Sequence, residues 1–101
     1  MTRPDDSLVA WRNSWPALVV RNGERTVGFI RCLTDTEITA YIAEILVAPE
    51  FRHQGLGEAL ISICHHLYPL VRFDLLCTES VDGFYHAIGC RRFKGYRKSW
   101  A

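Results

Sequence analysis

The feature that most constrains the fold is a junction between an apolar run and an amphipathic segment, with two glycines where they meet. The run Ile38–Val47 is rich in β-formers, and Pro49 ends it because proline cannot continue a paired central strand. From Gly55 to Tyr68 the apolar residues recur at helical spacing, and Gly57 follows Gly55 with one residue between them. The sequence therefore predicts a strand, a glycine-containing loop and a helix, in that order.

The helical period predicts which side chains of the helix are buried. One face carries Leu56, Ala59, Leu60, Ile63, Cys64 and Leu67. His65 and His66 fall on the opposite face with the other polar residues, and we expect both in solvent.

The residues around the junction predict further strands. Asn22-Gly23 is a tight-turn signal that joins Ala17–Arg21 and Thr26–Leu33 into an antiparallel hairpin. Val71–Cys77 predicts a strand after the helix. A short helix from about Ser80 or Asp82 to Gly89 and a final strand, Arg91–Trp100, complete the chain.

The predicted order β-β-β-α-β-α-β is an α/β arrangement, in which helices cover a mixed sheet that begins with an antiparallel meander. A chain of 101 residues leaves no room for a second independent core. Residues 1–16 contain Pro4 and Pro16 and lack a sustained period, so we expect an N-terminal arm. Residues 17–101 are then a single domain.

Composition excludes several function classes. The net charge of +1 indicates no general attraction to nucleic acid or anionic membranes, and we interpret the basic C-terminal run as a solvated strand face. The sequence shows neither a signal peptide nor a membrane span, which predicts a cytoplasmic protein. The four cysteines lack metal-ligand spacing and are expected as buried free thiols: Cys32, Cys64, Cys77 and Cys90. No metal site is predicted.

The junction loop has the chemistry of an anion site. A helix start has N–H groups without internal partners and the positive end of the helix dipole, and glycine lets the main chain approach an anion. Arg52 adds a cation. The glycine spacing matches neither the dinucleotide-binding nor the triphosphate-binding pattern. A plain turn that only begins a helix is the alternative.

Two segments carry a family resemblance. Val47–Gly57 resembles the pyrophosphate loop of the GNAT superfamily, whose motif Gln/Arg-x-x-Gly-x-Gly/Ala is met by Arg52, Gly55 and Gly57. Phe84–Gly89 is similar to the Phe-Tyr-x-x-x-Gly-Phe segment of that superfamily. The resemblance spans about residues 17–93. It implies a GNAT-like fold and an N-acetyltransferase that transfers an acetyl group from acetyl-CoA to a primary amine.

The resemblance also implies where CoA binds. The pantetheine arm would pair like an added strand with the main chain at Leu46 and Val47, and a bulge within Ala43–Leu46 would open a slot for the thioester. The remaining CoA-binding positions, implied by the loop, are Arg52, His53, Gln54, Gly55, Leu56, Gly57 and Glu58.

Tyr85 matches the position of a general acid that protonates the departing CoA thiolate. The alternative is that Tyr85 only packs on the apolar face of the short helix. For the general base the first candidate is Glu44, because a carboxylate inside an apolar run needs a wet cleft or a partner. Asp35, Glu37 and His53 are the other candidates.

The implied reaction is direct transfer in a ternary complex, with a main-chain N–H near Leu46 or Val47 stabilising the oxyanion. A base is needed because an amine of pKa near 10.4 is neutral in only roughly one molecule per 10³ at pH 7. We expect His86 on the helix surface.

The chain departs from the family pattern. Only sixteen residues precede Ala17, where typical members carry a strand and two helices that form an acceptor wall. Thr78 lies where family members often have an asparagine, six residues before the Phe-Tyr pair. Cys90 lies where they have an aromatic residue after the final glycine. The acceptor site is then open, or a homodimer completes it. Trp residues, which are enriched at interfaces, lie at positions 11, 15 and 100, although core packing is the alternative.

Two other function classes stay open. One is a non-catalytic acyl-CoA-binding or regulatory module, and the other is an interaction domain that binds no CoA. The acceptor amine is open between a small molecule and a protein.

Overall fold

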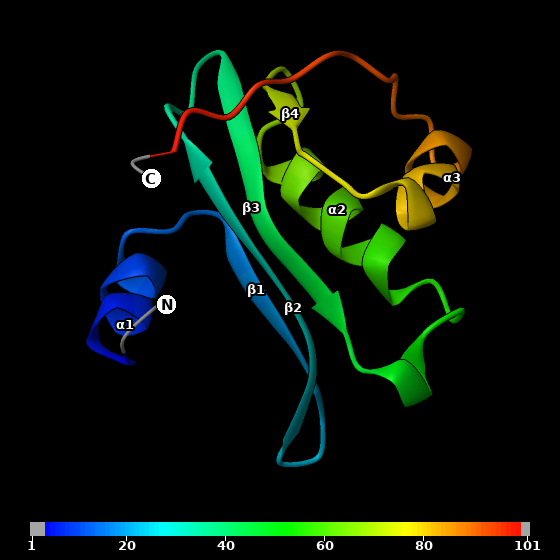
Figure 1. Ribbon diagram of the computed structural model, residues 1–101. Helices are drawn as coiled ribbons and strands as arrows, with labels where there is room; N and C mark the ends of the chain where they lie inside the picture. Colours follow the sequence, from blue (N-terminus) through cyan, green and yellow to red (C-terminus); the bar gives the residue numbers. More distant parts are fainter. Residues whose placement is uncertain (1–3, 100–101) are drawn as a thin grey trace.

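The structure is a computed structural model that describes residues 4–99 (Figure 1). Its elements are α1 (Pro4–Arg12), β1 (Ala17–Asn22), β2 (Arg25–Thr34), β3 (Thr39–Val47), a 3-10 turn η1 (Pro49–Phe51), α2 (Leu56–Leu67), β4 (Arg72–Asp74) and α3 (Glu79–Ala87). The predicted α/β class with a mixed sheet and the strand-loop-helix junction are confirmed. No helix among the described residues has the length and apolarity that a membrane span requires.

The sheet has the order β1-β2-β3-β4. The first three strands form the predicted antiparallel meander, while β4 joins in parallel to β3. This last pairing is short, because only Thr39–Tyr41 of β3 lie opposite Arg72–Asp74. The predicted strand Val71–Cys77 is therefore correct in place but too long, and the chain leaves the sheet after Asp74.

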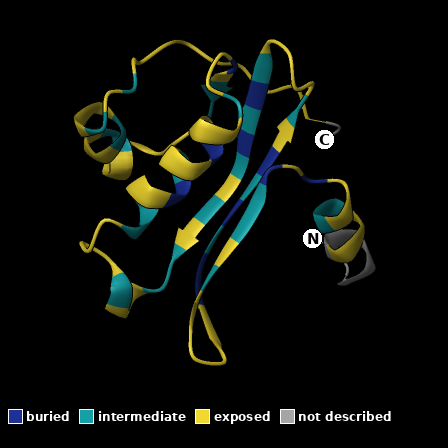
Figure 2. Cartoon of the chain, turned by 180° about the vertical axis from the view of Figure 1, so that it is seen from behind, coloured by how far each residue is buried: buried dark blue, intermediate teal, exposed yellow. Residues whose placement is uncertain are grey.

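Helix α2 covers one face of the sheet, and the core lies between them (Figure 2). The fully enclosed cluster consists of Ile30, Cys32, Ile42, Leu60 and Cys64. The predicted helix face is partly wrong, since Ile63 is 50% exposed and Leu67 48%, whereas Ile61 packs against the core. A helix turns by about 100° per residue, so a face centred between Leu60 and Ile61 leaves Ile63 outside the contact.

Within the predicted N-terminal arm the structure has a helix, α1, that the sequence pattern did not predict. It packs on the sheet face opposite α2, where Trp11 meets the ring of Phe29 edge-on at 5.4 Å. Trp15 is 52% exposed and its indole N–H donates to the hydroxyl of Tyr68 over 2.7 Å. The sequence signal for α1 is Pro4 at the first helical position followed by two aspartates, which suit a helix start.

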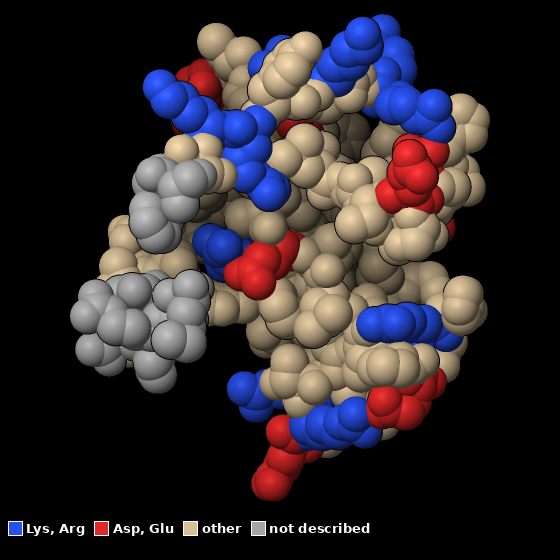
Figure 3. All heavy atoms as spheres, in the orientation of Figure 1, with Lys and Arg blue, Asp and Glu red and all other residues tan. Residues whose placement is uncertain are grey.

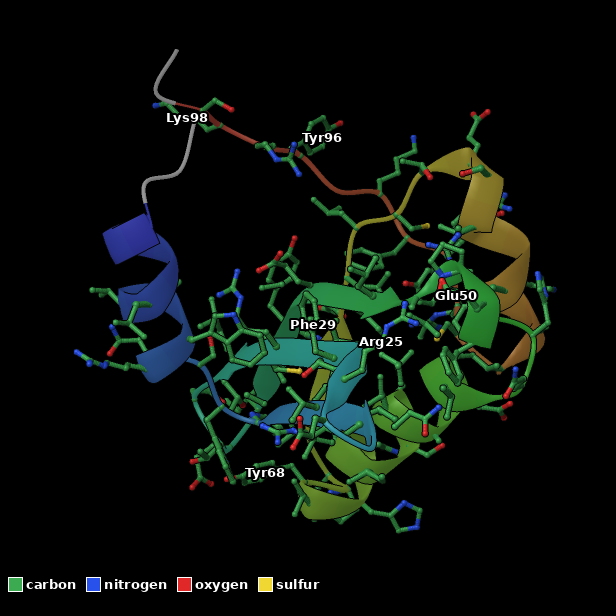
Figure 4. All side chains as sticks on the ribbon, turned by 90° about the horizontal axis from the view of Figure 1, so that it is seen from below. Arg25, Phe29, Glu50, Tyr68, Tyr96 and Lys98 are labelled. Atoms are coloured by element: carbon green, nitrogen blue, oxygen red, sulfur yellow. The ribbon has the colours of Figure 1, made fainter. Side chains whose placement is uncertain are left out.

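The final strand predicted over Arg91–Trp100 is wrong for the described part of that range. Residues 90–99, called the C-terminal segment below, form no strand, and Trp100 lies outside the described residues. The segment runs from α3 across β4 and β3 on the side of the sheet opposite α2 (Figures 1 and 4). Residues 91–99 are all exposed, so no buried face exists to hold a strand in register.

Candidate functional site

Strands β3 and β4 separate beyond their short pairing. Residues 42–47 of β3 pair with β2 on one side, and no described strand pairs with them on the other. The register with β2 also shifts at this point: Arg31 lies opposite Glu44, and Cys32 lies opposite Ile42, which leaves Ala43 as an extra residue. This is the predicted β-bulge, and it lies where the two strands part.

A groove of about 360 Å³ occupies the gap between the separated strands. We call it the split-strand groove. It brings together three predicted site residues, namely Glu44 and Leu46 of β3 and Tyr85 of α3. Its other lining residues are Phe29, Ile42, Ala43, Ile45, Leu75, Leu76, Cys77, Thr78 and Val81. Main-chain groups along β3 that have no ladder partner face this space, and such groups are strong hydrogen-bonding sites.

The loop between β3 and α2 has the geometry of an anion site. Gly55 precedes the helix in the left-handed conformation, with φ 83°, and a side chain there would meet no atom within 4 Å. The main-chain N–H groups of residues 53–58 donate to no acceptor within the described part of the chain. These groups lie at the positive end of the α2 dipole, where anions are stabilised.

Gly57 has a packing role besides the predicted contact with CoA, which stays a prediction. A Cβ at this position would lie 3.2 Å from Cζ of Phe84, which is tighter than ordinary packing. The absence of a side chain therefore lets the start of α2 approach α3 closely. The two motifs that the sequence singled out are in direct contact here.

The loop is braced from both sides. Arg52 donates from Nε to the carbonyl oxygen of Val47 over 2.9 Å, so its side chain folds back on the end of β3. Arg25 of β2 forms an ion pair with Glu50 (Figure 4). The Arg25 guanidinium also lies over the ring of Phe51. The hydrogen bond from Arg25 holds the pKa of the Glu50 carboxyl below its usual value. Sequence reasoning missed Arg25, because only the register of the hairpin brings it to the loop.

Tyr85 is half-buried on the wall of the split-strand groove. Burial raises the pKa of its phenol, and the neighbouring thiols of Cys77 and Cys90 raise it further. The phenol is therefore protonated at neutral pH, the state that a proton donor needs. Its ring contacts Phe84 edge-on at 5.0 Å, so packing also fixes its orientation.

Glu44 has a partner that the sequence did not reveal. Its Oε1 accepts from Nε of Arg31 over 2.8 Å, and Nη1 of Arg31 reaches Oγ of Ser14 at 3.2 Å. The Ser14 hydroxyl donates to the carbonyl oxygen of Ala10 in α1. The Arg31 side chain is 16% exposed and that of Glu44 52%, so a largely buried guanidinium orients a carboxylate that water can still reach.

The other candidate bases lie elsewhere. One carboxylate oxygen of Asp35 accepts main-chain N–H groups of Glu37, Ile38 and Thr39, and these bonds hold the pKa of Asp35 below its usual value. Asp35 therefore shapes the β2–β3 turn. Neither Glu37 nor His53 lines the split-strand groove. Both are exposed, as are His65, His66 and His86.

The cysteines divide into two pairs. Cys32 and Cys64 are buried as predicted, and both belong to the core cluster between β2 and α2. The prediction is wrong for the second pair, since Cys77 is exposed and Cys90 only half-buried. Cys77 lies in the groove because β4 stops at Asp74, and the following residues then line the open side.

Comparison with solved structures places this arrangement among acetyltransferases. A protein of Deinococcus radiodurans R1 that is assigned to the acetyltransferases gives a TM-score of 0.81 at 25% identity, with 96% of this chain and 71% of that chain covered. A GNAT-family acetyltransferase of Streptococcus pneumoniae TIGR4 gives a TM-score of 0.71 at 18% identity, with 98% and 94% covered.

The aminoglycoside N-acetyltransferase AAC(6')-Iy, solved in complex with CoA, gives a TM-score of 0.63 at 18% identity, with 82% and 75% covered. No curated protein matches the sequence. The family model of the acetyltransferase (GNAT) domain matches residues 13–91. That range is well over half of the chain, and the protein therefore belongs to the GNAT acetyltransferase family, whose members transfer acyl groups from acyl-CoA.

Proposed function

We propose that the protein is an N-acetyltransferase that transfers the acetyl group of acetyl-CoA to a primary amine in a ternary complex. The observation that carries this proposal is the split-strand groove, because it holds Glu44 and Tyr85 beside an unpaired strand edge. The donor-rich loop lies at the end of that same strand.

The fit of acetyl-CoA to the chain follows from two sets of main-chain groups. The N–H groups of residues 53–58 suit the pyrophosphate, because each charge-assisted hydrogen bond contributes roughly 1.5–3 kcal/mol. The free edge of β3 over residues 42–47 suits the amides of the pantetheine arm, which would add to the sheet as a strand does. The carbonyl of Val47 already accepts from Arg52, so Leu46 and the residues before it are the better partners. The complex of AAC(6')-Iy with CoA supports this assignment by analogy of fold.

The groove residues divide the chemistry between them. Glu44, held by Arg31, accepts a proton from the acceptor ammonium, directly or through one water molecule. The neutral amine then attacks the thioester carbonyl carbon and a C–N bond forms. The nitrogen of this tetrahedral intermediate loses its second proton to water, and the C–S bond breaks to leave the amide. A main-chain N–H of β3 near Leu46 stabilises the oxyanion. Tyr85 donates its proton to the departing thiolate sulfur.

The test is release of free thiol from acetyl-CoA with a panel of primary amines. We expect Tyr85→Phe and Glu44→Gln each to lower kcat by about 10²-fold or more, with little change in the KM for acetyl-CoA. Tyr68→Phe, at the C-terminal end of α2, and Glu24→Gln, in the β1–β2 turn, lie outside the groove lining; they are the matched controls and should retain the wild-type rate.

CoA binding without turnover of any amine would refute the transferase proposal and favour a non-catalytic acyl-CoA-binding module. Thermal stability that does not change with excess CoA would refute the binding site itself, because a ligand selective for the native state must stabilise it.

A further inference from the structure

A second cavity adjoins the split-strand groove on the side of the sheet opposite α2. It has a volume of about 440 Å³ and shares Leu75 and Leu76 with the groove. We call it the C-terminal cavity, because the C-terminal segment forms its outer wall. Its other lining residues are Tyr41, Asp74, Phe93, Gly95, Tyr96, Arg97 and Lys98. Figure 4 shows Tyr96 and Lys98 on this side of the sheet, away from α2 and Tyr68.

The C-terminal segment approaches the residues after β4 at Gly95. A Cβ at Gly95 would lie 2.9 Å from a methyl carbon of Leu76, so a larger residue there would displace the Leu76 side chain. Tyr41 and Phe93 give the cavity aromatic walls, and Leu75 is half-buried beneath them. An apolar or aromatic group of a ligand would be stabilised in such a space.

The charge of the cavity is positive. Residues 91–99 contain five Arg and Lys residues and no Asp or Glu. Arg92 pairs with Asp82, whereas Arg97 and Lys98 line the cavity. The one carboxylate of the lining, Asp74, is 3.1 Å from Nε of Arg72 and is thereby balanced. Figure 3 shows Lys and Arg side chains gathered along the upper part of this face, where the C-terminal segment crosses.

The cavity lies next to the reacting groups. Ile42 and Ile45 of β3 pack into the core on the α2 side, so Tyr41 and Glu44 point to the other face of the sheet. These two residues are three positions apart on the strand. At about 3.3 Å per residue, the cavity therefore begins within about 10 Å of the Glu44 position.

We propose that the C-terminal cavity binds the acceptor, and that the acceptor is a primary amine that carries a carboxylate at its far end. This inference rests on the proposed transferase function. The aromatic walls contact the body of the acceptor, Arg97 and Lys98 pair with its carboxylate, and its amine lies at Glu44. Amines with a second positive charge at the same distance are disfavoured, because they would face two cations.

Three matched amines test the proposal: 4-(aminomethyl)benzoate, benzylamine and 4-(aminomethyl)benzylamine. They share a ring and a reacting aminomethyl group and differ in the para substituent, which is a carboxylate, a hydrogen atom or a second, cationic aminomethyl group. We expect kcat/KM to be about 3- to 10-fold higher for the benzoate than for benzylamine, since exposed ion pairs are individually weak. The diamine should be the poorest acceptor, and added salt should reduce the differences.

Variants locate the effect in the cavity. Arg97→Gln with Lys98→Gln should abolish the preference, so that kcat/KM for the benzoate becomes equal to or lower than kcat/KM for benzylamine in the same variant. Arg91→Gln with Lys94→Gln removes the same charge from the same segment but outside the cavity lining, and should keep the preference. Equal or better turnover of benzylamine by the wild type would overturn the inference and leave the transferase function intact. If no amine that is tested leads to thiol release, both the inference and the transferase function are overturned.

Discussion

Substitution of two glycines by alanine tests whether the CoA loop requires the left-handed backbone conformation at residue 55. Both glycines have free space around them, so an added methyl group causes no clash at either position. Neither Gly55 nor Gly83 would bring a Cβ within 4 Å of another atom. They differ in the backbone, since Gly55 has φ 83° before α2, whereas Gly83 lies inside α3 without a positive φ. Alanine at each position therefore tests the left-handed conformation alone.

The expected changes have opposite signs. Alanine in the left-handed region costs roughly 1–2 kcal/mol of strain, part of which is offset because alanine also reduces the entropy of the unfolded chain. For Gly55→Ala we expect a net loss of about 1 kcal/mol, or a Tm lower by about 4–8 °C for a domain of this size. Gly83→Ala should raise the Tm by a similar amount, because alanine exceeds glycine in helix propensity by about 1 kcal/mol.

Thermal unfolding followed by circular dichroism, with and without CoA, measures both effects. Gly55→Ala should also reduce the stabilisation by CoA, since relief of the strain turns the N–H groups of the loop away from the anion. Gly83→Ala should keep the full CoA response. A Tm of Gly55→Ala equal to or above that of the wild type would refute the reasoning, because it would show that residue 55 is not held in the left-handed conformation.

Three further predictions concern the groove, the β2–β3 turn and assembly. Arg31→Gln should lower kcat and leave the KM for acetyl-CoA nearly unchanged, because Glu44 loses its orienting partner. Arg21→Gln on β1 is the matched control, and equal losses of kcat in the two variants would contradict this role. Asp35→Ala should lower the Tm at pH 7, and chemical denaturation over pH 2–8 should show the difference shrink as the pH falls below the unfolded value of about 4. The folded-state pKa of Asp35 lies below its unfolded value, so its contribution is fully present above the unfolded value and is lost as the pH falls through the folded value; a difference that stays constant from pH 7 to pH 2 would contradict this assignment. Light scattering should show a homodimer, since Trp15 is 52% exposed and Trp is enriched at interfaces; an active monomer saturated with CoA would contradict it.

The strand-loop-helix junction could be predicted because its signals are local. Pro49 ends a strand and Gly55 begins a helix through the conformations of single residues, whatever the rest of the chain does. The prediction of a bulge in β3 rested instead on the family resemblance, because the alternation of apolar and polar side chains is ambiguous around Ala43.

The elements that the sequence failed to predict, or predicted wrongly, depend on tertiary contacts. Helix α1 shows no apolar period, and it is held by the contact of Trp11 with Phe29. The C-terminal segment contains residues that favour strands, but it lies against Leu76 through Gly95 and pairs with no described strand. Local propensity cannot show either outcome.

The partners of the predicted site residues could not be predicted for a related reason. Arg31 meets Glu44, and Arg25 meets Glu50, only because the registers of the sheet and the course of the loop bring them together. Ser14 joins the first pair from the end of α1. A sequence shows the residue types needed for a site, whereas the pairing of charges across strands is a property of the folded sheet.

A crystal structure of the protein with CoA tests the central claim most directly. We predict that the pyrophosphate accepts hydrogen bonds from the main-chain N–H groups of residues 53–58. The pantetheine arm should run along the free edge of β3 over residues 42–47, with its sulfur in the split-strand groove beside Tyr85. CoA bound at another place would contradict the account. A groove that is closed by β4 and the residues after it, although CoA is saturating, would also contradict it.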